Sequence, residues 1–384
     1  MENSKVTIVL VGIGGYGETY LRALDRGRYG WDDVCVKGIV DPYAANSKYF
    51  GFFAERGISV FDDLESFYAV HKADLAVIST PIQLHKPQCC IALANGSHVL
   101  CEKPITPCVE DWRIIKEAEA ASGKRVAVGF QWSFCDVMLE LKADYLAGVF
   151  GKPLKLKSMV SWPRGRDYYE SSTWKGRIRD ARGNLINDSI TSNATAHYVH
   201  NMFYITGDGA GVSAMPEDMR VELYKAKDIQ THDTIFLRGK LNNGAEFMYA
   251  ASHAVTKNES PRFAYEFEQG TADLNEADKD DIVRFRFRDG RVKEYGCPFS
   301  FEVDSAKLDA MIEFVADGGV GDIACGLDTV YPHIYVCDWL MEQGVEMFPE
   351  EMRIDEGQGV FCPSLYGDLV ECYDSGLLLS ELIN

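Results

Sequence analysis

The sequence predicts two domains of different fold class. Residues 1–129 are expected to form an α/β domain with a doubly wound parallel sheet, and residues 130–384 an α+β domain with a large, mostly antiparallel open sheet. Three observations support this prediction. The first third alternates apolar strands with helical segments, the chain then changes to alternating stretches separated by hairpin turns, and 384 residues exceed the usual size of one core.

The alternation in the first domain favours parallel strands with helices on both faces of the sheet. Apolar strands are expected at 5–11, 34–40, 74–80, 98–101 and 125–130. Helical patterns lie between them, at 17–25, 44–55, 85–94 and 109–121.

The second domain is marked by hairpin turns. Asn242-Asn243-Gly244 separates strands expected at 234–241 and 246–251, and Asp289-Gly290 separates strands at 282–288 and 291–295. Helices are expected at 136–147, 193–206, 305–316, 329–342 and 366–379.

Composition and charge exclude several classes of protein. Hydrophobic residues make up 46% and the net charge is −19, which argues against nucleic-acid binding because that needs clustered cations. No apolar run reaches the length of a membrane span, and the first residues lack the pattern of a signal peptide, so a cytoplasmic location is expected. Eleven cysteines without a Cys-x-x-Cys pair indicate reduced thiols.

A glycine-rich turn follows the first strand and opens the first helix. It contains Gly12, Ile13, Gly14, Gly15, Tyr16 and Gly17. In this strand–turn–helix context the glycines allow a tight turn, the approach of a pyrophosphate and close packing of the helix, as in the dinucleotide-binding Rossmann domain.

An acid ends the second strand at the position that binds the adenosine ribose. Asp41 would accept hydrogen bonds from the ribose hydroxyls and would repel a 2′-phosphate, and the first cation after it is Lys48. NAD is therefore expected in preference to NADP. Asp41 could also cap the following helix, and both roles can hold at once.

Further motifs follow at the ends of later strands: Ser79-Thr80-Pro81 with His85, then Glu102-Lys103-Pro104, then Val128-Gly129-Phe130-Gln131-Trp132. With the glycine turn and Asp41, this ordered set resembles the glucose-fructose oxidoreductase / inositol dehydrogenase / rhizopine-catabolism (Gfo/Idh/MocA) family. The resemblance is dense to about residue 132 and sparser beyond. It implies an NAD-dependent dehydrogenase acting on CH–OH groups.

The resemblance also implies roles for single residues. Lys103 lies beside the nicotinamide and the substrate, where an ammonium stabilises a developing alkoxide, and Glu102 is the neighbour that holds it. Thr80, Pro81, His85 and Gln131 are expected to line the cofactor, although His85 could equally serve only the start of its helix.

The helix expected at 193–206 carries the candidate acid/base group. Asn193, His197 and His200 are spaced to share one face. In the family this helix carries an Asp and, four residues later, a His; here the His matches His197 but Asn193 replaces the acid. Asn193 could orient a substrate hydroxyl or cap the helix, and Asp188 is hypothesised to restore the carboxylate. His200 is expected beside the substrate.

A metal at His197 and His200 would need a third ligand, such as Asp188 or His253, and no spacing rule supports one. No metal is therefore expected.

The segment before this helix is the expected substrate loop. Residues 151–190 hold nine Lys and Arg against four Asp and Glu, a local +5 in an acidic half. Trp162 and Trp174 would pack on sugar C–H faces, while Arg166 and Lys175 would bind hydroxyls or a carboxylate. An ordinary surface loop, or an arm around a partner subunit, explains the same pattern.

These observations predict hydride transfer between a sugar, cyclitol or sugar-acid carbinol and NAD, in a homodimer or homotetramer that uses its open sheet face. Two alternatives stay open. One is a redox-assisted glycosidase or lyase that retains NAD, and the other is a non-catalytic NAD-dependent sensor.

Overall fold

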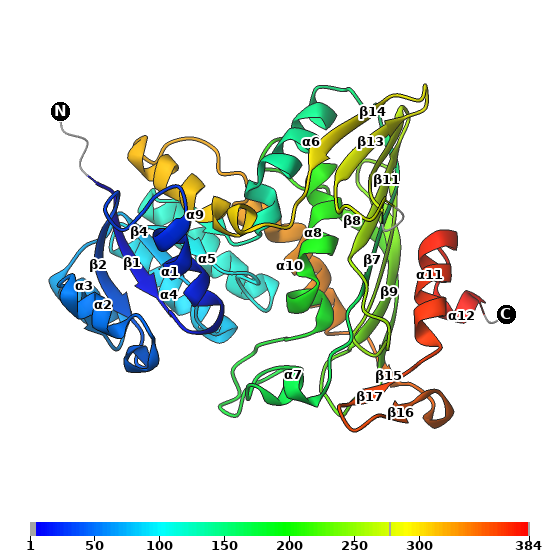
Figure 1. Cartoon of the computed structure of the whole chain (residues 1–384), viewed down its shortest axis with the longest axis horizontal. Helices are drawn as coiled ribbons and strands as arrows, with labels where there is room; N and C mark the ends of the chain where they lie inside the picture. Colours follow the sequence, from blue (N-terminus) through cyan, green and yellow to red (C-terminus); the bar gives the residue numbers. More distant parts are fainter. Residues whose placement is uncertain (1–4, 276–277, 383–384) are drawn as a thin grey trace. The chain divides into compact units, whose positions relative to one another are not determined.

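The computed structural model describes residues 5–275 and 278–382, which separate into two compact units. Unit 1 combines Met1–Cys135 with Phe299–Asp328, and unit 2 combines Asp136–Pro298 with Thr329–Asn384 (Figure 1). The fold classes predicted for the two domains are confirmed. The division differs from the predicted boundary at residue 129, because a segment from late in the chain returns to unit 1.

Unit 1 is built on a six-stranded parallel sheet of order β3-β2-β1-β4-β5-β6. Its strands are β1 Thr7–Val11, β2 Cys35–Val40, β3 Ser59–Phe61, β4 Leu75–Ile78, β5 His98–Cys101 and β6 Val126–Val128. The strands β1, β4, β5 and β6 are almost wholly buried, which explains their uninterrupted apolar sequence. The chain order reverses between β1 and β4, the position at which such sheets bind ligands.

Helices join these strands, as the alternation predicts. They are α1 Glu18–Arg26, α2 Phe50–Glu55, α3 Leu64–Val70, α4 Ile82–Ala94 and α5 Val109–Ser122, with short 3-10 turns at Gly15–Gly17, Ala44–Asn46 and Gln131–Phe134. The single helix expected at 44–55 is divided into a 3-10 turn and α2. The strand β3 and helix α3 were not predicted, because β3 is short and mostly exposed and shows no apolar pattern.

Helix α9, Phe301–Ala316, corrects the predicted domain boundary. It packs against α1, β4, β5 and the turn Gln131–Phe134 of unit 1. Its apolar spacing identifies a helix, but spacing alone does not tell which core a helix joins. The domain ranges 1–129 and 130–384 are therefore replaced by the two discontinuous units.

Unit 2 is built on a nine-stranded sheet of order β14-β13-β12-β11-β7-β10-β9-β8-β15. The pairs β7/β10 and β8/β15 are parallel and the other pairs antiparallel. The strands are β7 Pro153–Ser161, β8 Pro216–Lys225, β9 Thr234–Leu241, β10 Glu246–Ser252, β11 Arg262–Phe267, β12 Gly270–Leu274, β13 Val283–Phe287, β14 Val292–Gly296 and β15 Val345–Met347. Both predicted hairpins, β9–β10 and β13–β14, are confirmed.

The helices of unit 2 are α6 Asp136–Leu146, α7 Arg166–Glu170, α8 Ala196–Ile205, α10 Leu327–Leu340, α11 Leu365–Ser375 and α12 Leu379–Leu382, with a 3-10 turn at Glu350–Met352 and a small ribbon of β16 Ile354–Asp355 and β17 Val360–Phe361. Helices α8 and α11 pack on opposite faces of the sheet (Figure 1). Buried side chains of α11 and α12 form one apolar cluster with β7, β9 and β10. Part of the sheet face expected to be open is therefore covered.

A buried lysine joins α6 to the end of α8. Lys142 is 2% exposed, and its Nζ donates to the carbonyl oxygens of Tyr204, Val212 (2.9 Å) and Gly207 (3.4 Å). These carbonyls lie at or just beyond the carboxyl end of α8, where the helix dipole favours a cation. Burial nevertheless lowers the pKa of Lys142 to about 7, and Asp208 opposes this shift only in part.

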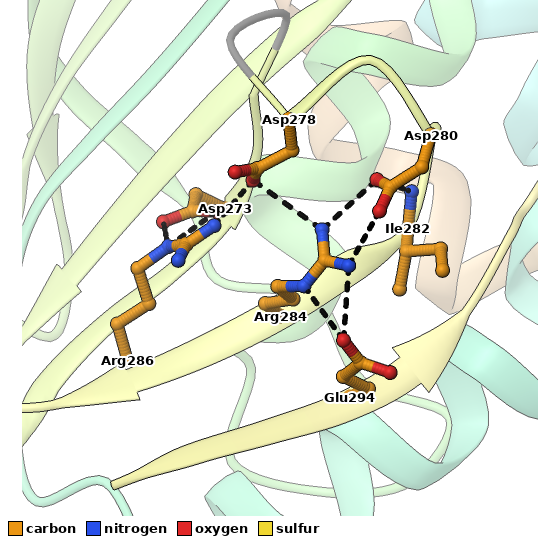
Figure 2. Close-up of polar contacts among 7 residues, drawn as sticks. All are labelled: Asp273, Asp278, Asp280, Ile282, Arg284, Arg286 and Glu294. Atoms are coloured by element: carbon orange, nitrogen blue, oxygen red, sulfur yellow. Dashed lines mark hydrogen bonds and ion pairs between the residues drawn. The ribbon is translucent and has the colours of Figure 1, made fainter. Parts of the chain in front are cut away.

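An ion-pair network braces β12, β13 and β14 (Figure 2). Arg284 on β13 contacts Asp280 (2.6 Å), Glu294 (2.9 Å) and Asp278 (3.3 Å). Its neighbour Arg286 reaches Asp273 at 2.9 Å and also Asp278. Both arginines are thus held by acids on neighbouring strands and on the connection before β13.

Within residues 5–275 and 278–382, no helix has the length and apolar character needed to cross a bilayer. In the same ranges, no group of three or more His, Cys, Asp or Glu side chains is arranged to hold a metal ion.

Candidate functional site

The glycine turn lies at the carboxyl end of β1, where its glycines are sterically required. Gly12 has φ +78°, and a Cβ there would lie 2.8 Å from the carbonyl oxygen of Ser79. A Cβ at Gly17 would lie 2.2 Å from the carbonyl oxygen of Gly12. By contrast, a Cβ at Gly14 would meet no atom within 4 Å. The turn is thus packed tightly on its protein side and open at Gly14, as a pyrophosphate site needs.

Asp41 is attached to this turn by its carboxylate. One oxygen accepts from the backbone N–H of Ile13 at 2.9 Å, and the other accepts from the N–H of Tyr43 at 2.8 Å. Asp41 therefore fixes the end of β2 against the glycine turn. The second contact is a local turn interaction. Because Tyr43 is the N-cap of the turn Ala44–Asn46, the helix-capping role considered for Asp41 is wrong.

A buried ion pair connects the glycine turn to the Glu-Lys-Pro turn. Lys307 on α9 is fully buried and contacts the Glu102 carboxylate at 2.5 Å. Its Nζ also lies 3.0 Å from the Tyr16 Oη, and it donates to the Gly129 carbonyl oxygen at 3.3 Å. Tyr20 donates to the same Glu102 oxygen at 2.5 Å.

This cluster fixes the protonation of its members. Burial alone would lower the pKa of Lys307, but Glu102 and Tyr16 outweigh it and the net pKa is raised, so the ammonium persists. Burial raises the pKa of Tyr16 to about 12. Gly129 is required here, since a Cβ would lie 2.9 Å from the Glu102 carboxylate.

The Glu102 side chain therefore does more than the neighbour role expected from the sequence. It accepts from the backbone N–H of Lys103 at 3.3 Å, while its carboxylate anchors α1 and α9 through Tyr20 and Lys307. Sequence reasoning missed Tyr20 and Lys307. Tyr20 lies 82 residues from Glu102 in the chain and Lys307 lies 205, and no local pattern signals such distant partners.

His85 does not offer its ring to a ligand, in contrast to the prediction. It is 1% exposed, and its two ring nitrogens lie 2.7 Å from the Thr80 carbonyl oxygen and 2.9 Å from that of Pro104. The ring therefore braces the loop after β4 against the Lys103-Pro104 turn. The Thr80 Oγ1 donates to Gln88 at 2.5 Å, and Gln131 reaches Asp304 of α9 at 3.5 Å.

In unit 2 the structure brings Asp188 to Asn193. The Asn193 amide donates to one Asp188 oxygen at 2.8 Å, and the Gly176 N–H donates to the other at 2.7 Å. Asp188 is 3% exposed. A carboxylate is thus held beside the position where the family has its acid, but through the Asn193 amide.

The helix around His197 is not continuous, which corrects the predicted shared face. Residues Ile190–Ala194 form a π-helical turn, and α8 begins only at Ala196. Ser189 caps the turn through Ser192, so the capping role weighed for Asn193 belongs to Ser189. An α-helical spacing of four and seven residues therefore does not relate Asn193 to the histidines.

His197 and His200 differ in burial. His197 is partly exposed. His200 is 1% exposed and stacks on Tyr204 at 5.8 Å, and burial, with His333 and Lys142, places its pKa well below the usual value. His200 is a neutral core residue, and the predicted substrate contact is not supported.

The expected substrate loop is partly neutralised within unit 2. Arg166 pairs with Asp355 at 2.5 Å and donates to the Gly357 carbonyl oxygen at 3.2 Å, and both partners belong to the β16–β17 ribbon. Lys175 lies 4.1 Å from the Tyr168 ring centroid and donates to Ser171 at 2.8 Å. Trp162 packs edge-on against Tyr198 at 5.6 Å. Trp174 is partly exposed.

Sequence reasoning did not single out Arg164, a second arginine of this loop. Arg164 lies over the rings of Trp162 (5.7 Å) and Tyr168 (5.4 Å). The neighbouring Tyr169 Oη lies 2.9 Å from the buried ring of His253. The available signal was the tripeptide Trp-Pro-Arg with paired tyrosines four residues on, but it did not distinguish Arg164 from Arg166.

Comparison with known proteins finds a family match for the first part of the chain. Residues 6–130 match the Gfo/Idh/MocA family of oxidoreductases, described as an NAD-binding Rossmann fold. For residues 6–130 this match confirms the resemblance and the NAD-binding Rossmann fold that the sequence motifs predict.

Two relatives are similar to part of this chain. Inositol 2-dehydrogenase 4 of Saccharopolyspora erythraea is 34% identical over 155 residues, 40% of this chain and 45% of the relative. Inositol 2-dehydrogenase of Acidothermus cellulolyticus is 35% identical over 150 residues, 39% and 43% of the two chains. The match spans less than half the length of these relatives.

Solved structures extend the similarity of fold to both units. The WlbA dehydrogenase of Bordetella pertussis, in complex with NADH and UDP-GlcNAcA, has a TM-score of 0.68 at 21% identity, covering 87% of this chain and 97% of WlbA. A levoglucosan dehydrogenase in complex with NADH has a TM-score of 0.70 at 16% identity, covering 88% and 96%. These similarities establish the fold of the chain.

Proposed function

We propose that this protein is an NAD-dependent oxidoreductase that transfers a hydride between a sugar, cyclitol or sugar-acid carbinol and nicotinamide. One observation carries the proposal: Lys307 joins Tyr16 of the glycine turn to Glu102 of the Glu-Lys-Pro turn in one buried cluster. The part of the chain that would bind the dinucleotide is thereby held to the part that carries the reactive lysine. The inositol dehydrogenases and the levoglucosan dehydrogenase support the substrate class.

The residues of unit 1 fit the cofactor. Bound NAD would supply the hydride acceptor. The open side of Gly14 would admit the pyrophosphate against backbone N–H groups, and Asp41 would bind the ribose and disfavour a 2′-phosphate. These features favour NAD over NADP.

The chemistry needs two groups from the protein. When the carbinol C–H leaves as hydride, its O–H must lose a proton and the oxygen carries negative charge. The Lys103 ammonium would stabilise that charge, and the imidazole of His197 would accept the proton. Asn193, held by Asp188, would orient a hydroxyl of the substrate. The homodimer or homotetramer and the cytoplasmic location remain predictions.

The direct test measures NADH formation from NAD⁺, or NADPH formation from NADP⁺, with a panel of myo-inositol, glucose and glucuronate. Lys103→Ala and His197→Ala should each lower turnover by about 10²- to 10⁴-fold, with NAD binding by calorimetry nearly unchanged. Lys72→Ala and His71→Ala serve as matched controls outside the site. Unchanged turnover in either site variant removes that residue from the mechanism.

Other outcomes identify the alternatives. Substrate conversion without net NADH would indicate a redox-assisted glycosidase or lyase. Stabilisation by NAD and a sugar without any conversion would indicate a sensor.

A further inference from the structure

Arg164 occupies an unusual position just beyond the end of β7. Its backbone N–H donates to the His253 carbonyl oxygen at 3.2 Å, which fixes this segment beside the residue that follows β10. Its guanidinium carbon lies 5.7 Å from the Trp162 ring centroid and 5.4 Å from that of Tyr168. Contact with two aromatic rings holds the planar group in one place without neutralising its charge.

No acid in the described part of the chain forms an ion pair with Arg164. Among residues 5–275 and 278–382, its guanidinium has no ion pair or hydrogen bond, and its Nε is buried without a partner. Two buried acids of this region are engaged elsewhere: Asp188 accepts from Gly176 and Asn193, and Asp233 pairs with Lys227 at 3.4 Å. A half-buried guanidinium that lacks a carboxylate partner has unused N–H donors, arranged to bind two oxygens at once.

Lys175 adds a second cation over the same Tyr168 ring. Its Nζ lies 4.1 Å from the ring centroid, and its hydrogen bond goes to the Ser171 hydroxyl, a neutral group. Burial lowers the pKa of Lys175, and the negative charge of Asp188 opposes the shift, which places these groups within electrostatic reach of each other.

The two cations adjoin the residues proposed to handle the substrate. Asp188, which acts electrostatically on both Lys175 and Tyr168, is hydrogen-bonded to Asn193. Trp162, one of the rings under Arg164, packs against Tyr198, which follows His197 in the chain. All these contacts lie within unit 2.

We propose that Arg164, assisted by Lys175, is the anion-binding subsite for the substrate, so that the sugar or cyclitol carries a carboxylate or a phosphate. The inference rests on the proposed function and specifies its substrate class. Arg166, which the sequence singled out, is not part of the subsite because Asp355 already neutralises it. The guanidinium fork would bind two oxygens of the anion, and the Lys175 ammonium would add a point charge.

The experiment compares three sugars that share one ring: glucose, glucuronate and glucose 6-phosphate. NADH formation gives kcat and KM, and calorimetry in the presence of NAD⁺ gives affinity independently of turnover. We expect the wild type to prefer one of the two anions, and that sugar identifies the group as carboxylate or phosphate.

The variants separate three contributions to anion binding: the charge of Arg164, the geometry of its guanidinium, and the charges of nearby arginines. Arg164→Met should raise KM or Kd for the preferred anion by about 10- to 100-fold, with glucose changed less than about threefold. Arg164→Lys should recover part of the affinity, because it restores the charge without the fork. Arg166→Met should leave the preference intact, and Arg182→Met, on the exposed part of the same segment, is the matched control.

The outcomes distinguish this inference from the proposed function. If glucose and both anions are oxidised or bound equally well, the anionic subsite is wrong and the oxidoreductase stands. Equal losses for neutral and anionic sugars in a folded Arg164→Met would show a structural role only. If the wild type binds neither anion by calorimetry, the subsite is also wrong, and the NADH assay on myo-inositol still tests the proposed function.

Discussion

Two almost fully buried lysines, Lys307 in unit 1 and Lys142 in unit 2, have opposite surroundings. Lys307 in unit 1 pairs with a carboxylate, Glu102, and its pKa is raised. Lys142 in unit 2 donates only to backbone carbonyl oxygens in the described part of the chain, and burial lowers its pKa to about 7. Carbonyl dipoles satisfy the hydrogen bonds of an ammonium, but a full negative charge is what keeps it protonated against the penalty of burial.

The largest effect is expected at Lys307. Replacing it in Lys307→Met leaves the Glu102 charge buried and should lower the free energy of unfolding by about 3–5 kcal/mol. The double variant Lys307→Met/Glu102→Gln should lose less unfolding free energy than Lys307→Met, because no uncompensated charge remains buried. Urea unfolding followed by circular dichroism measures both.

Arg113→Met is the matched control for this pair. The Arg113 side chain is exposed and lies 3.7 Å from Glu110. If Lys307→Met is as stable as Arg113→Met, the buried pair does not hold unit 1 together.

A smaller, pH-dependent effect is expected at Lys142. An unfolded chain keeps lysine protonated up to its ordinary value of 10.5, whereas folded Lys142 releases its proton near 7. Between these values the unfolded state binds more protons, so the free energy of unfolding should rise with pH, by about 2 kcal/mol from pH 7 to 9.

Lys142→Met should remove this rise in unfolding free energy, measured by urea unfolding at several pH values. A slope that persists unchanged in Lys142→Met would assign it to another group. Asp208→Asn should move the rise to lower pH, since Asp208 raises the pKa of Lys142.

The smallest effect is expected in the network of Figure 2, where the acids around Arg284 are partly or well exposed. Arg284 has more carboxylate partners than Lys307, yet its partners are solvated, and Arg284→Met should destabilise less than either buried variant. The loss should shrink in about 1 M NaCl, which screens exposed charges and leaves buried pairs unaffected.

Acid titration is a second test of the Arg284 network. Arg284 lowers the pKa of Asp280 to about 2, so the contribution of this pair should be complete above about pH 4 and lost as the pH falls through 2. A loss of unfolding free energy in Arg284→Met that is independent of both salt and acid would contradict an electrostatic origin.

The sequence predicted what is encoded locally. The glycine turn and its flanking strand and helix are contiguous, and Asn242-Asn243-Gly244 specifies its own hairpin, so each could be recognised from neighbouring residues. Helix α9 was recognised as a helix but assigned to the wrong unit, because its partners lie far away in the chain.

Partners that are distant in the chain also limited the prediction of single site residues. Arg166 and Arg164 look alike in sequence, and only the fold brings Asp355 to Arg166, 189 residues away. Asn193 was placed on a shared face with His197 because apolar spacing does not reveal a π-helical turn. Asp188, in contrast, was found because its partner Asn193 is five residues away.

The late arrival of α9 has a consequence for synthesis. Glu102 is made 205 residues before Lys307, the cation that neutralises it. At ordinary translation rates of about 5–20 residues per second, the interval is on the order of 10 to 40 s. Throughout it the growing chain carries Glu102 without the cation that neutralises it, so unit 1 is complete only after the strands of unit 2 through β14 have been made.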